Sequence, residues 1–128
     1  MATNNRIFTS FAVEDHRYRD LLVGQARNER SPFEFVDMSV KEAWDSQWKT
    51  KCRAKIRACD GMIALLSSSS PGAEGHLWEI ACAKEERVPV IGIYVSDTDR
   101  PGYMPAELSG VRIVTWTWPN IAYFISSL

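Results

Sequence analysis

Short apolar runs alternate along the chain with longer stretches in which apolar residues recur every three or four positions. The runs have the length of β-strands, and the stretches have the period of about 3.6 residues of an α-helix. The runs predict strands at residues 6–11, 33–36, 61–67, 88–95 and 111–116. The periodic stretches predict helices at about residues 14–30, 46–59, 74–86 and 121–128. Strands that alternate with helices are typical of a parallel sheet covered by helices on both faces.

The apolar content of the strands predicts their places in the sheet. Residues 61–67 and 88–95 are apolar almost throughout, as strands buried on both faces are, whereas residues 111–116 alternate as an edge strand does. We therefore predict an α/β fold: a flavodoxin-like five-stranded parallel sheet in the order 2-1-3-4-5, flanked by helices. In that order the ligand crevice lies at the carboxyl ends of strands one and three. These ends are Thr9–Phe11 and Ser67–Ser70, so two serine-containing loops are expected to face each other.

Length and composition restrict the classes of function. The chain has 128 residues, which predicts a single domain over residues 1–128. Its 15 Lys and Arg residues against 16 Asp and Glu residues give a net charge of −1. This balance argues against a nucleic-acid-binding protein, which normally carries a basic surplus. No apolar run approaches the length of about 18 residues that a membrane span needs, and residues 1–8 lack the apolar core of a signal peptide.

Cysteine and histidine usage predicts a cytoplasmic protein without a metal site. The three cysteines, an odd number in a chain without a signal peptide, are expected to be buried thiols. No CxxC pair is present, and His16 and His76 stand 60 residues apart. The motifs GxGxxG, GxxxxGK[ST] and GxSxG are absent, which argues against a Rossmann dinucleotide site, a P-loop and a hydrolase nucleophile elbow. A phosphoacceptor site is not expected either, because the third strand ends in serines instead of an aspartate.

The helix after the third strand holds the strongest candidate for chemistry. Helical spacing places Leu77, Ile80, Ala81 and Lys84 on its core face and Glu79 on a neighbouring face. Large apolar residues flank Glu79 on both sides in the sequence. A carboxylate in this setting is either a poised functional group or a solvated surface acid, and spacing alone leaves both interpretations open.

Three segments, taken together, resemble TIR-like domains, specifically the small bacterial group that includes the TIR protein of Thoeris anti-phage systems. The first is RIFTSFAVEDH, a strand that ends in Ser-Phe before an acidic pair. The second is AWDSQWKTKCRAKIRACDGMIALLSSSS, a helix that leads through Cys-Asp into the third strand. The third is LWEIACAKEERVPVIGIYV, a Trp-Glu-Ile helix that leads into a Val-Pro-Val-Ile-Gly strand. The resemblance covers nearly the whole chain.

The resemblance implies an activity. Members of this family bind NAD and cleave its nicotinamide–ribose bond with one glutamate on the helix after strand three. Glu79 matches that position, so the resemblance implies that Glu79 is the catalytic residue. The sequence departs from the family pattern where Trp and Ser often precede the glutamate, because Gly75 and Ala73 stand there. Glu74 and Glu85 are the fallback candidates.

The chemistry explains why one carboxylate suffices. Nicotinamide is already a cationic leaving group in NAD and needs no general acid. Cleavage generates oxocarbenium character at the anomeric carbon, which a carboxylate offsets. NAD is then the substrate, and no separate cofactor is expected. Attack by water gives ADP-ribose, whereas attack by the adenine or a ribose hydroxyl of the same molecule gives a cyclic isomer. The resemblance favours a cyclic or conjugated ADP-ribose signal that activates a partner effector protein.

Other residues are predicted to surround the substrate, each with a structural alternative. The serines can hydrogen-bond ribose or phosphate, or cap their loops. The aromatic residues, with Trp48, can stack on the bases or pack in the core. Basic residues of the helix at 46–59 can meet the pyrophosphate or form a solvated face. In TIR domains the loop after strand two borders the NAD pocket and often mediates self-association. The predicted substrate-binding residues are Ser10, Phe11, Asp37, Ser39, Trp44, Ser67, His76 and Trp78.

Two other functions stay open at this point. A non-catalytic TIR module would act by homotypic assembly through the loop at residues 37–39, and the replaced residues upstream of Glu79 favour it. A nucleoside deoxyribosyltransferase-like enzyme would use a related fold and a catalytic glutamate. NAD consumption separates the first alternative from the enzyme, and base exchange on deoxynucleosides identifies the second.

Overall fold

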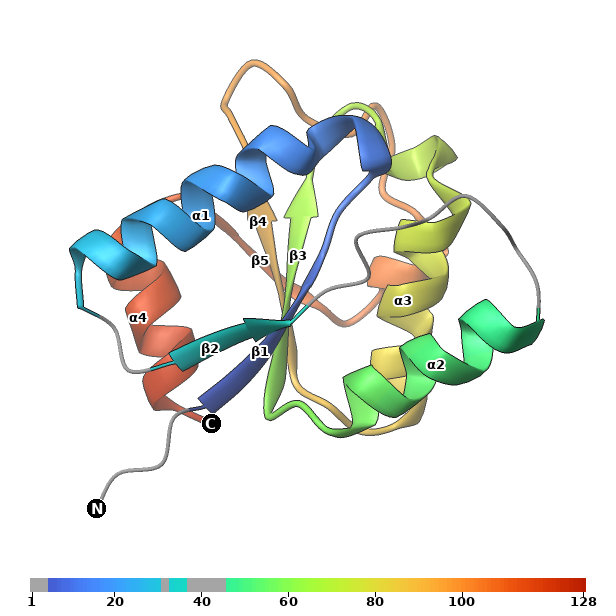
Figure 1. The fold of residues 1–128 in the computed structure, drawn as a ribbon. Coiled ribbons are helices and arrows are strands. Elements are labelled where there is room, and N and C mark those ends of the chain that lie inside the picture. The colour runs from blue at the N-terminus through green and yellow to red at the C-terminus, as the bar shows by residue number, and fades with distance from the viewer. Residues whose placement is uncertain (1–4, 31–32, 37–45) are drawn as a thin grey trace.

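The computed structural model describes residues 5–30, 33–36 and 46–128, which form a five-stranded parallel sheet with helices on both faces (Figure 1). The order of the strands is β2-β1-β3-β4-β5, and every neighbouring pair is parallel. This arrangement confirms the predicted flavodoxin-like order. The strands are β1 (Asn5–Ser10), β2 (Phe33–Val36), β3 (Gly61–Leu66), β4 (Val90–Tyr94) and β5 (Arg112–Thr115).

Two pairs of helices cover the two faces of the sheet. The helices α2 (Ser46–Arg57) and α3 (Glu74–Glu85) pack on one face, where Ile56 and Ile80 join one buried cluster. The helices α1 (His16–Asn28) and α4 (Trp118–Ser126) pack on the other. Short 3-10 turns lie at η1 (Val13–Asp15), η2 (Ser70–Gly72) and η3 (Ala106–Leu108). None of the described helices is long and apolar enough to cross a membrane.

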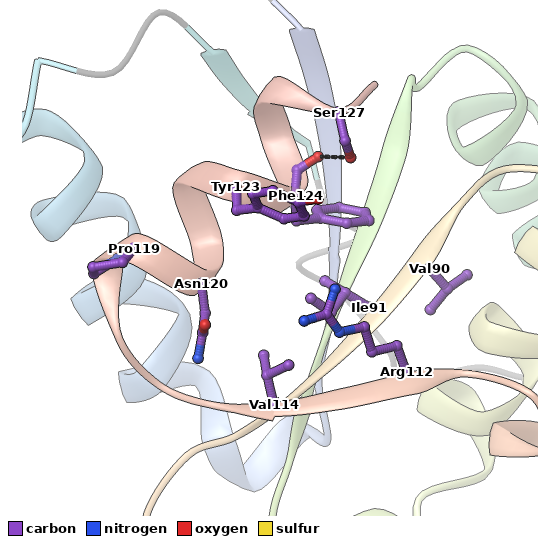
Figure 2. A pocket seen from close by; sticks show the side chains of 9 residues that line it. All are labelled: Val90, Ile91, Arg112, Val114, Pro119, Asn120, Tyr123, Phe124 and Ser127. Atoms are coloured by element: carbon purple, nitrogen blue, oxygen red, sulfur yellow. Dashed lines mark hydrogen bonds between the residues drawn. The ribbon is translucent and has the colours of Figure 1, made fainter.

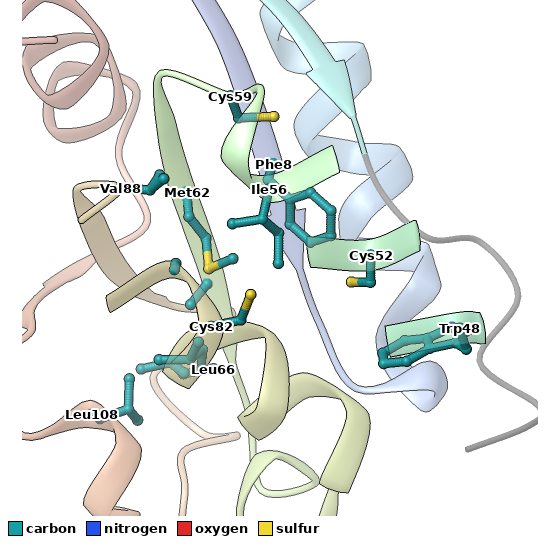
Figure 3. Close-up of a cluster of buried hydrophobic side chains, with 13 residues drawn as sticks. Phe8, Trp48, Cys52, Ile56, Cys59, Met62, Leu66, Cys82, Val88 and Leu108 are labelled. Atoms are coloured by element: carbon teal, nitrogen blue, oxygen red, sulfur yellow. The ribbon is translucent and has the colours of Figure 1, made fainter. Parts of the chain in front are cut away.

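The central strand β3 separates the two hydrophobic clusters. All six of its residues are buried, as its continuous apolar run predicts. Met62, Ala64 and Leu66 face α2 and α3, whereas Ile63 and Leu65 face α1 and α4. Figure 3 shows the first cluster, in which side chains from α2 and α3 meet those of the sheet. The alternation of side chains along β3 therefore gives each helix pair its own core.

Two helix starts differ from the sequence prediction, and most other element ends differ from it by one or two residues. The last helix begins at Trp118 instead of residue 121. Thr117 is its N-cap, with the hydroxyl accepting a hydrogen bond from the backbone N–H of Asn120 at 3.2 Å, and Pro119 stands in its first turn. A threonine N-cap with a proline in the first turn is a helix-start signal that the apolar pattern alone did not reveal. The predicted helix at residues 14–30 begins as the 3-10 turn η1 before α1.

The three cysteines confirm the expectation of buried thiols. Cys52, Cys59 and Cys82 are all buried, and none forms a disulfide. Burial raises the pKa of the Cys59 and Cys82 thiols to about 11. Among the described residues, no group of three or more His, Cys, Asp or Glu side chains is placed to hold a metal ion.

Candidate functional site

The end of β1 and the start of α3 meet at the carboxyl edge of the sheet. Ser10 is the last residue of β1, is fully buried, and pairs in register with Ala64 of β3. Its side chain points to the same face as Phe8, toward α3. The Ser10 hydroxyl donates a hydrogen bond to Glu79 Oε1 at 2.7 Å and lies 2.7 Å from His76 Nδ1. The structure thus brings together three of the predicted site residues.

Glu79 is fully buried, with none of its surface exposed to solvent. The alternative of a solvated surface acid is therefore wrong. The predicted core face of α3 is also displaced: Leu77 and Ala81 are half-buried and Lys84 is exposed, whereas the buried face includes Glu79 and Ala83. The reason is that α3 packs against both the sheet and α2, so apolar spacing does not single out one buried face.

Hydrogen bonds from two other elements satisfy the buried carboxylate. Ser10 donates to Oε1, and the Cys52 thiol of α2 donates to Oε2 at 3.7 Å. The Ser10 hydroxyl has a single hydrogen, which it donates to Glu79. In the short contact between Ser10 and His76, the imidazole Nδ1–H is therefore the donor and the hydroxyl oxygen the acceptor. We call this donor series, in which His76 donates to Ser10 and Ser10 donates to Glu79, the His76–Ser10–Glu79 chain. Burying a carboxylate without donors would be costly, and the chain offsets that cost.

A second polar cluster joins the loop after β3 to the turn after β1. The Ser67 hydroxyl donates to the Asp15 carboxylate and accepts a hydrogen bond from the Ser69 backbone N–H at 3.0 Å. The backbone N–H of Ser68 donates to Asp99 Oδ1 at 2.8 Å. Burial raises the pKa of Asp15, although the Ser67 hydrogen bond opposes the shift, while the hydrogen bonds from Ser68 lower the pKa of Asp99. Ser67 is thus engaged in capping its own loop.

A pocket of about 290 Å³ opens beside the His76–Ser10–Glu79 chain. Phe11 and His76 lie in its wall together with the turn after β1 and the loop before α3. Phe11 is buried, with the Arg19 guanidinium 5.6 Å from the centroid of its ring. Because His76 both lines this pocket and contacts Ser10, it connects the pocket to the buried carboxylate. The pocket is lined by Phe11, Ala12, Val13, Glu14, Gly72, Ala73, Glu74, Gly75 and His76.

Residues 8–100 match the model of a protein family described as the TIR-like domain of the Thoeris protein ThsB. The match spans 93 of the 128 residues. The chain belongs to the ThsB TIR-like family. Its parallel sheet, with a buried glutamate on the helix after the third strand, is thus a TIR-like fold.

Solved structures agree on the fold. The TIR domains of the activated Roq1 resistosome, described as directly recognising the pathogen effector XopQ, match with a TM-score of 0.52 and 14% sequence identity. That match covers 71% of this chain and 57% of the other, so the TIR-like chain spans little more than half of that relative. At this identity the likeness concerns the fold alone. A search of curated proteins gave no significant match.

The two tryptophans of the ThsB-like site region pack against each other between α2 and α3. The ring centroids of Trp48 and Trp78 lie 5.5 Å apart at an interplanar angle of 61°, an edge-to-face arrangement. Trp48 belongs to the buried core, as one of its two interpretations predicted. Trp78 lines a pocket of about 480 Å³ together with Lys49 and Glu107. Glu74 lines both this pocket and the one beside His76, so the two pockets adjoin, and a substrate contact by Trp78 stays a prediction.

Ion pairs occupy part of the basic helix α2. Arg53 and Arg57 both bind Glu86, at 2.6 Å and 2.8 Å, and Arg53 also lies 3.2 Å from Glu85. These hydrogen bonds lower the pKa of Glu86 to about 2. The two arginines thus join α2 to the end of α3 and are engaged within the protein. Of the fallback acids, Glu85 forms this surface pair and Glu74 is exposed.

Sequence reasoning missed one residue that contacts the site. Cys52 was expected only as a buried thiol, yet this thiol donates a hydrogen bond to Glu79. Cys52 lies in the buried cluster with Trp48, but spacing on one helix carries no information about which residue of α3 it meets. The predicted residues Asp37, Ser39 and Trp44 lie outside the described part of the chain.

Proposed function

We propose that this TIR-like domain cleaves the nicotinamide–ribose bond of NAD and that Glu79 is the catalytic carboxylate. The observation that carries the proposal is the burial of Glu79 at the carboxyl edge of the sheet, where Ser10 holds it at 2.7 Å. Glutamate is almost never fully buried unless it is paired or hydrogen-bonded, so the donors that hold Glu79 mark it as a built feature of the fold. Membership of the ThsB TIR-like family supports the same activity.

The environment of Glu79 suits stabilisation of a cationic transition state. As the bond to nicotinamide breaks, positive charge develops on the ribose ring, and a carboxylate held in a water-poor site interacts with that charge strongly. Ser10 and Cys52 fix the two oxygens of the carboxylate from different elements, so little reorganisation is needed when charge appears. His76 orients the Ser10 hydroxyl and is a positioning residue in this proposal.

The product that we propose is a cyclic or conjugated ADP-ribose. The bond electrons leave with nicotinamide, which becomes neutral, and the anomeric carbon is then attacked by a nucleophile that loses its proton. With water the product is ADP-ribose, and with the adenine or a ribose hydroxyl it is cyclic. We propose that the signal acts on a partner effector protein in the cytoplasm, and that residues 1–128 work as one domain.

The test is mass spectrometry of NAD incubated with the purified protein. The wild type is expected to release nicotinamide and form an ADP-ribose product, whereas Glu79→Gln is expected to form none. Glu85→Gln is the matched control, because it makes the same change on the same helix at a side chain that is 61% exposed. Circular dichroism checks that the variants are folded. Equal turnover by wild type and Glu79→Gln would overturn the assignment.

A non-catalytic assembly module is the second candidate, favoured by Gly75 and Ala73 upstream of Glu79. It predicts no loss of NAD in any variant and a change of oligomeric state when residues 37–39 are replaced, which light scattering measures. Exchange of bases on deoxynucleosides in the same mass-spectrometric assay would instead identify a deoxyribosyltransferase-like enzyme.

A further inference from the structure

A pocket of about 460 Å³ lies on the face of the sheet opposite Glu79, between α4 and the edge strand β5 (Figure 2). None of its lining residues belongs to the predicted NAD site or to the His76–Ser10–Glu79 chain. Its volume is in the range of small-molecule sites, which is about 300–1,000 Å³. The lining residues are Val90, Ile91, Arg112, Val114, Pro119, Asn120, Tyr123, Phe124 and Ser127.

The pocket exists because α4 packs over the centre of the sheet and not over its edge. Phe124 and Leu128 lie against Gly61 at the start of β3. A Cβ atom at Gly61 would stand 2.8 Å from Leu128 Cδ1 and 3.2 Å from Phe124 Cζ, so glycine permits this close approach. With α4 held there, the starts of β4 and β5 are left with a hollow between them and the helix.

The walls of the hollow are mostly apolar, and the single charged side chain in its lining is Arg112. Ile91 and Phe124 are aliphatic and aromatic walls from β4 and α4. From residue 108 to residue 128, Arg112 is the only charged side chain in the sequence. Arg112 forms no ion pair with any residue that the structure describes. Its guanidinium lies 6.0 Å from the centroid of the Tyr123 ring, and Figure 2 shows it reaching from β5 toward α4.

Two other polar side chains of the pocket, those of Asn120 and Ser127, donate hydrogen bonds within the protein. Asn120 Nδ2 donates to the carbonyl oxygen of Thr115 at 3.0 Å. Ser127 Oγ donates to the carbonyl oxygen of Phe124 at 2.6 Å. The guanidinium of Arg112, which forms no ion pair with any described residue, therefore offers N–H donors to a ligand in this pocket. Its planar arrangement of donors matches a carboxylate or a phosphate group.

We propose that this pocket binds a small aromatic anion, a flat ring that carries a carboxylate or a phosphate group. The ring would lie in the hollow against Phe124 and Tyr123, where aromatic pairs are favourable, and the anionic group would meet Arg112. Arg112 and Tyr123 are exposed, so a ligand can reach both side chains from solvent. The proposal does not depend on NAD cleavage, since it rests on residues of another face.

The test is titration of the whole protein, followed by two-dimensional NMR, with benzoate, phenyl phosphate and the neutral analogue phenol. Benzoate and phenyl phosphate are expected to shift the amide signals of residues 90–91 and 112–127 and to bind at least tenfold more tightly than phenol. Comparison of the two anions decides whether a carboxylate or a phosphate is preferred. Arg112→Gln is expected to weaken the binding of both anions about tenfold and to leave phenol unchanged.

Two further variants keep the test decisive. Arg100→Gln is the matched control, because the Arg100 guanidinium also stacks on an aromatic ring, 4.2 Å from the centroid of Tyr94, but lies outside the pocket. It is expected to bind both anions as the wild type does. The Tyr123→Ala variant should fold, because Tyr123 is 68% exposed. It is expected to bind all three compounds more weakly than the wild type does. Equal affinity for phenol and the anions, or full binding by Arg112→Gln, would overturn the proposal, as would amide shifts confined to residues 10–16 and 72–79.

Discussion

The two faces of the sheet are built from different kinds of residue. The hydrophobic cluster under α1 and α4 consists of aliphatic and aromatic side chains, and the buried polar residue of β1 on that side is Thr9. The core under α2 and α3 holds all three cysteines, and Ser10 and Glu79 are buried on the same side of the sheet. An apolar core gains stability from every buried group, whereas a buried carboxylate costs stability even when it is hydrogen-bonded. One face therefore serves mainly to hold the sheet together, and the other gives up part of that stability for a polar site.

The largest expected effect is on the face of the sheet under α1 and α4, which we call the apolar face. Leu65→Ala removes a fully buried side chain of β3 that faces α1 and α4. The resulting cavity is expected to lower the free energy of unfolding by about 2–5 kcal/mol, which urea denaturation measures. NAD turnover per folded molecule should not change. Met104→Ala, at a side chain that is 46% exposed, is the control and should stay within about 0.5 kcal/mol of the wild type. A larger loss of activity than of folded protein would contradict the division between the faces.

The second prediction concerns the face of the sheet under α2 and α3, which we call the polar face. Ser10→Ala removes the hydroxyl that joins Glu79 to His76 there. Glu79 loses the donor at 2.7 Å, and His76 loses its contact with the hydroxyl. Leaving these buried groups unsatisfied is expected to cost about 1–3 kcal/mol of stability. We expect turnover of NAD to fall about a hundredfold, because the carboxylate is no longer fixed in place. Ser126→Ala, whose hydroxyl bonds the backbone within the exposed part of α4, should alter neither quantity.

A smaller effect concerns the ion pairs that join α2 to α3. Arg57 and Arg53 lower the pKa of Glu86 from 4.5 to about 2, so the folded protein binds this proton less readily than the unfolded chain does. The stability that the pairs contribute is therefore complete above pH 4.5 and lost as the pH falls toward 2. Urea denaturation should show a difference between wild type and Glu86→Gln at pH 7 that shrinks at pH 3. A difference that does not change with pH would contradict the role of these pairs.

The smallest expected effect concerns the reactivity of the three cysteine thiols, which all lie on the polar face. Because burial raises the pKa of Cys59 and Cys82 to about 11, few thiolates are present near neutral pH. Alkylation by iodoacetamide at pH 8 is expected to be slow in the native protein and fast in urea, as followed by mass spectrometry. Rapid labelling of native Cys82 would show that the face under α3 opens readily.

The sequence predicts the fold better than the site. The strand order follows from apolar runs such as Gly61–Leu66, because a strand buried on both faces has few alternatives. The position of Glu79 on α3 follows from the same local pattern together with the family resemblance. Its complete burial does not, because its donors Ser10 and Cys52 stand 69 and 27 positions away. Local periodicity contains no information about such distant partners.

The separation of 69 positions between Ser10 and Glu79 also bears on how the protein is made. During synthesis the serine leaves the ribosome long before its acceptor exists, and β1 must wait for β3 and α3 before the pair can form. Contacts so distant in sequence form slowly, since a long loop has to close first. A truncated or half-assembled chain would therefore carry the serine without its carboxylate. If Glu79 is the catalytic carboxylate, a growing chain cannot cleave NAD before β1, β3 and α3 have come together.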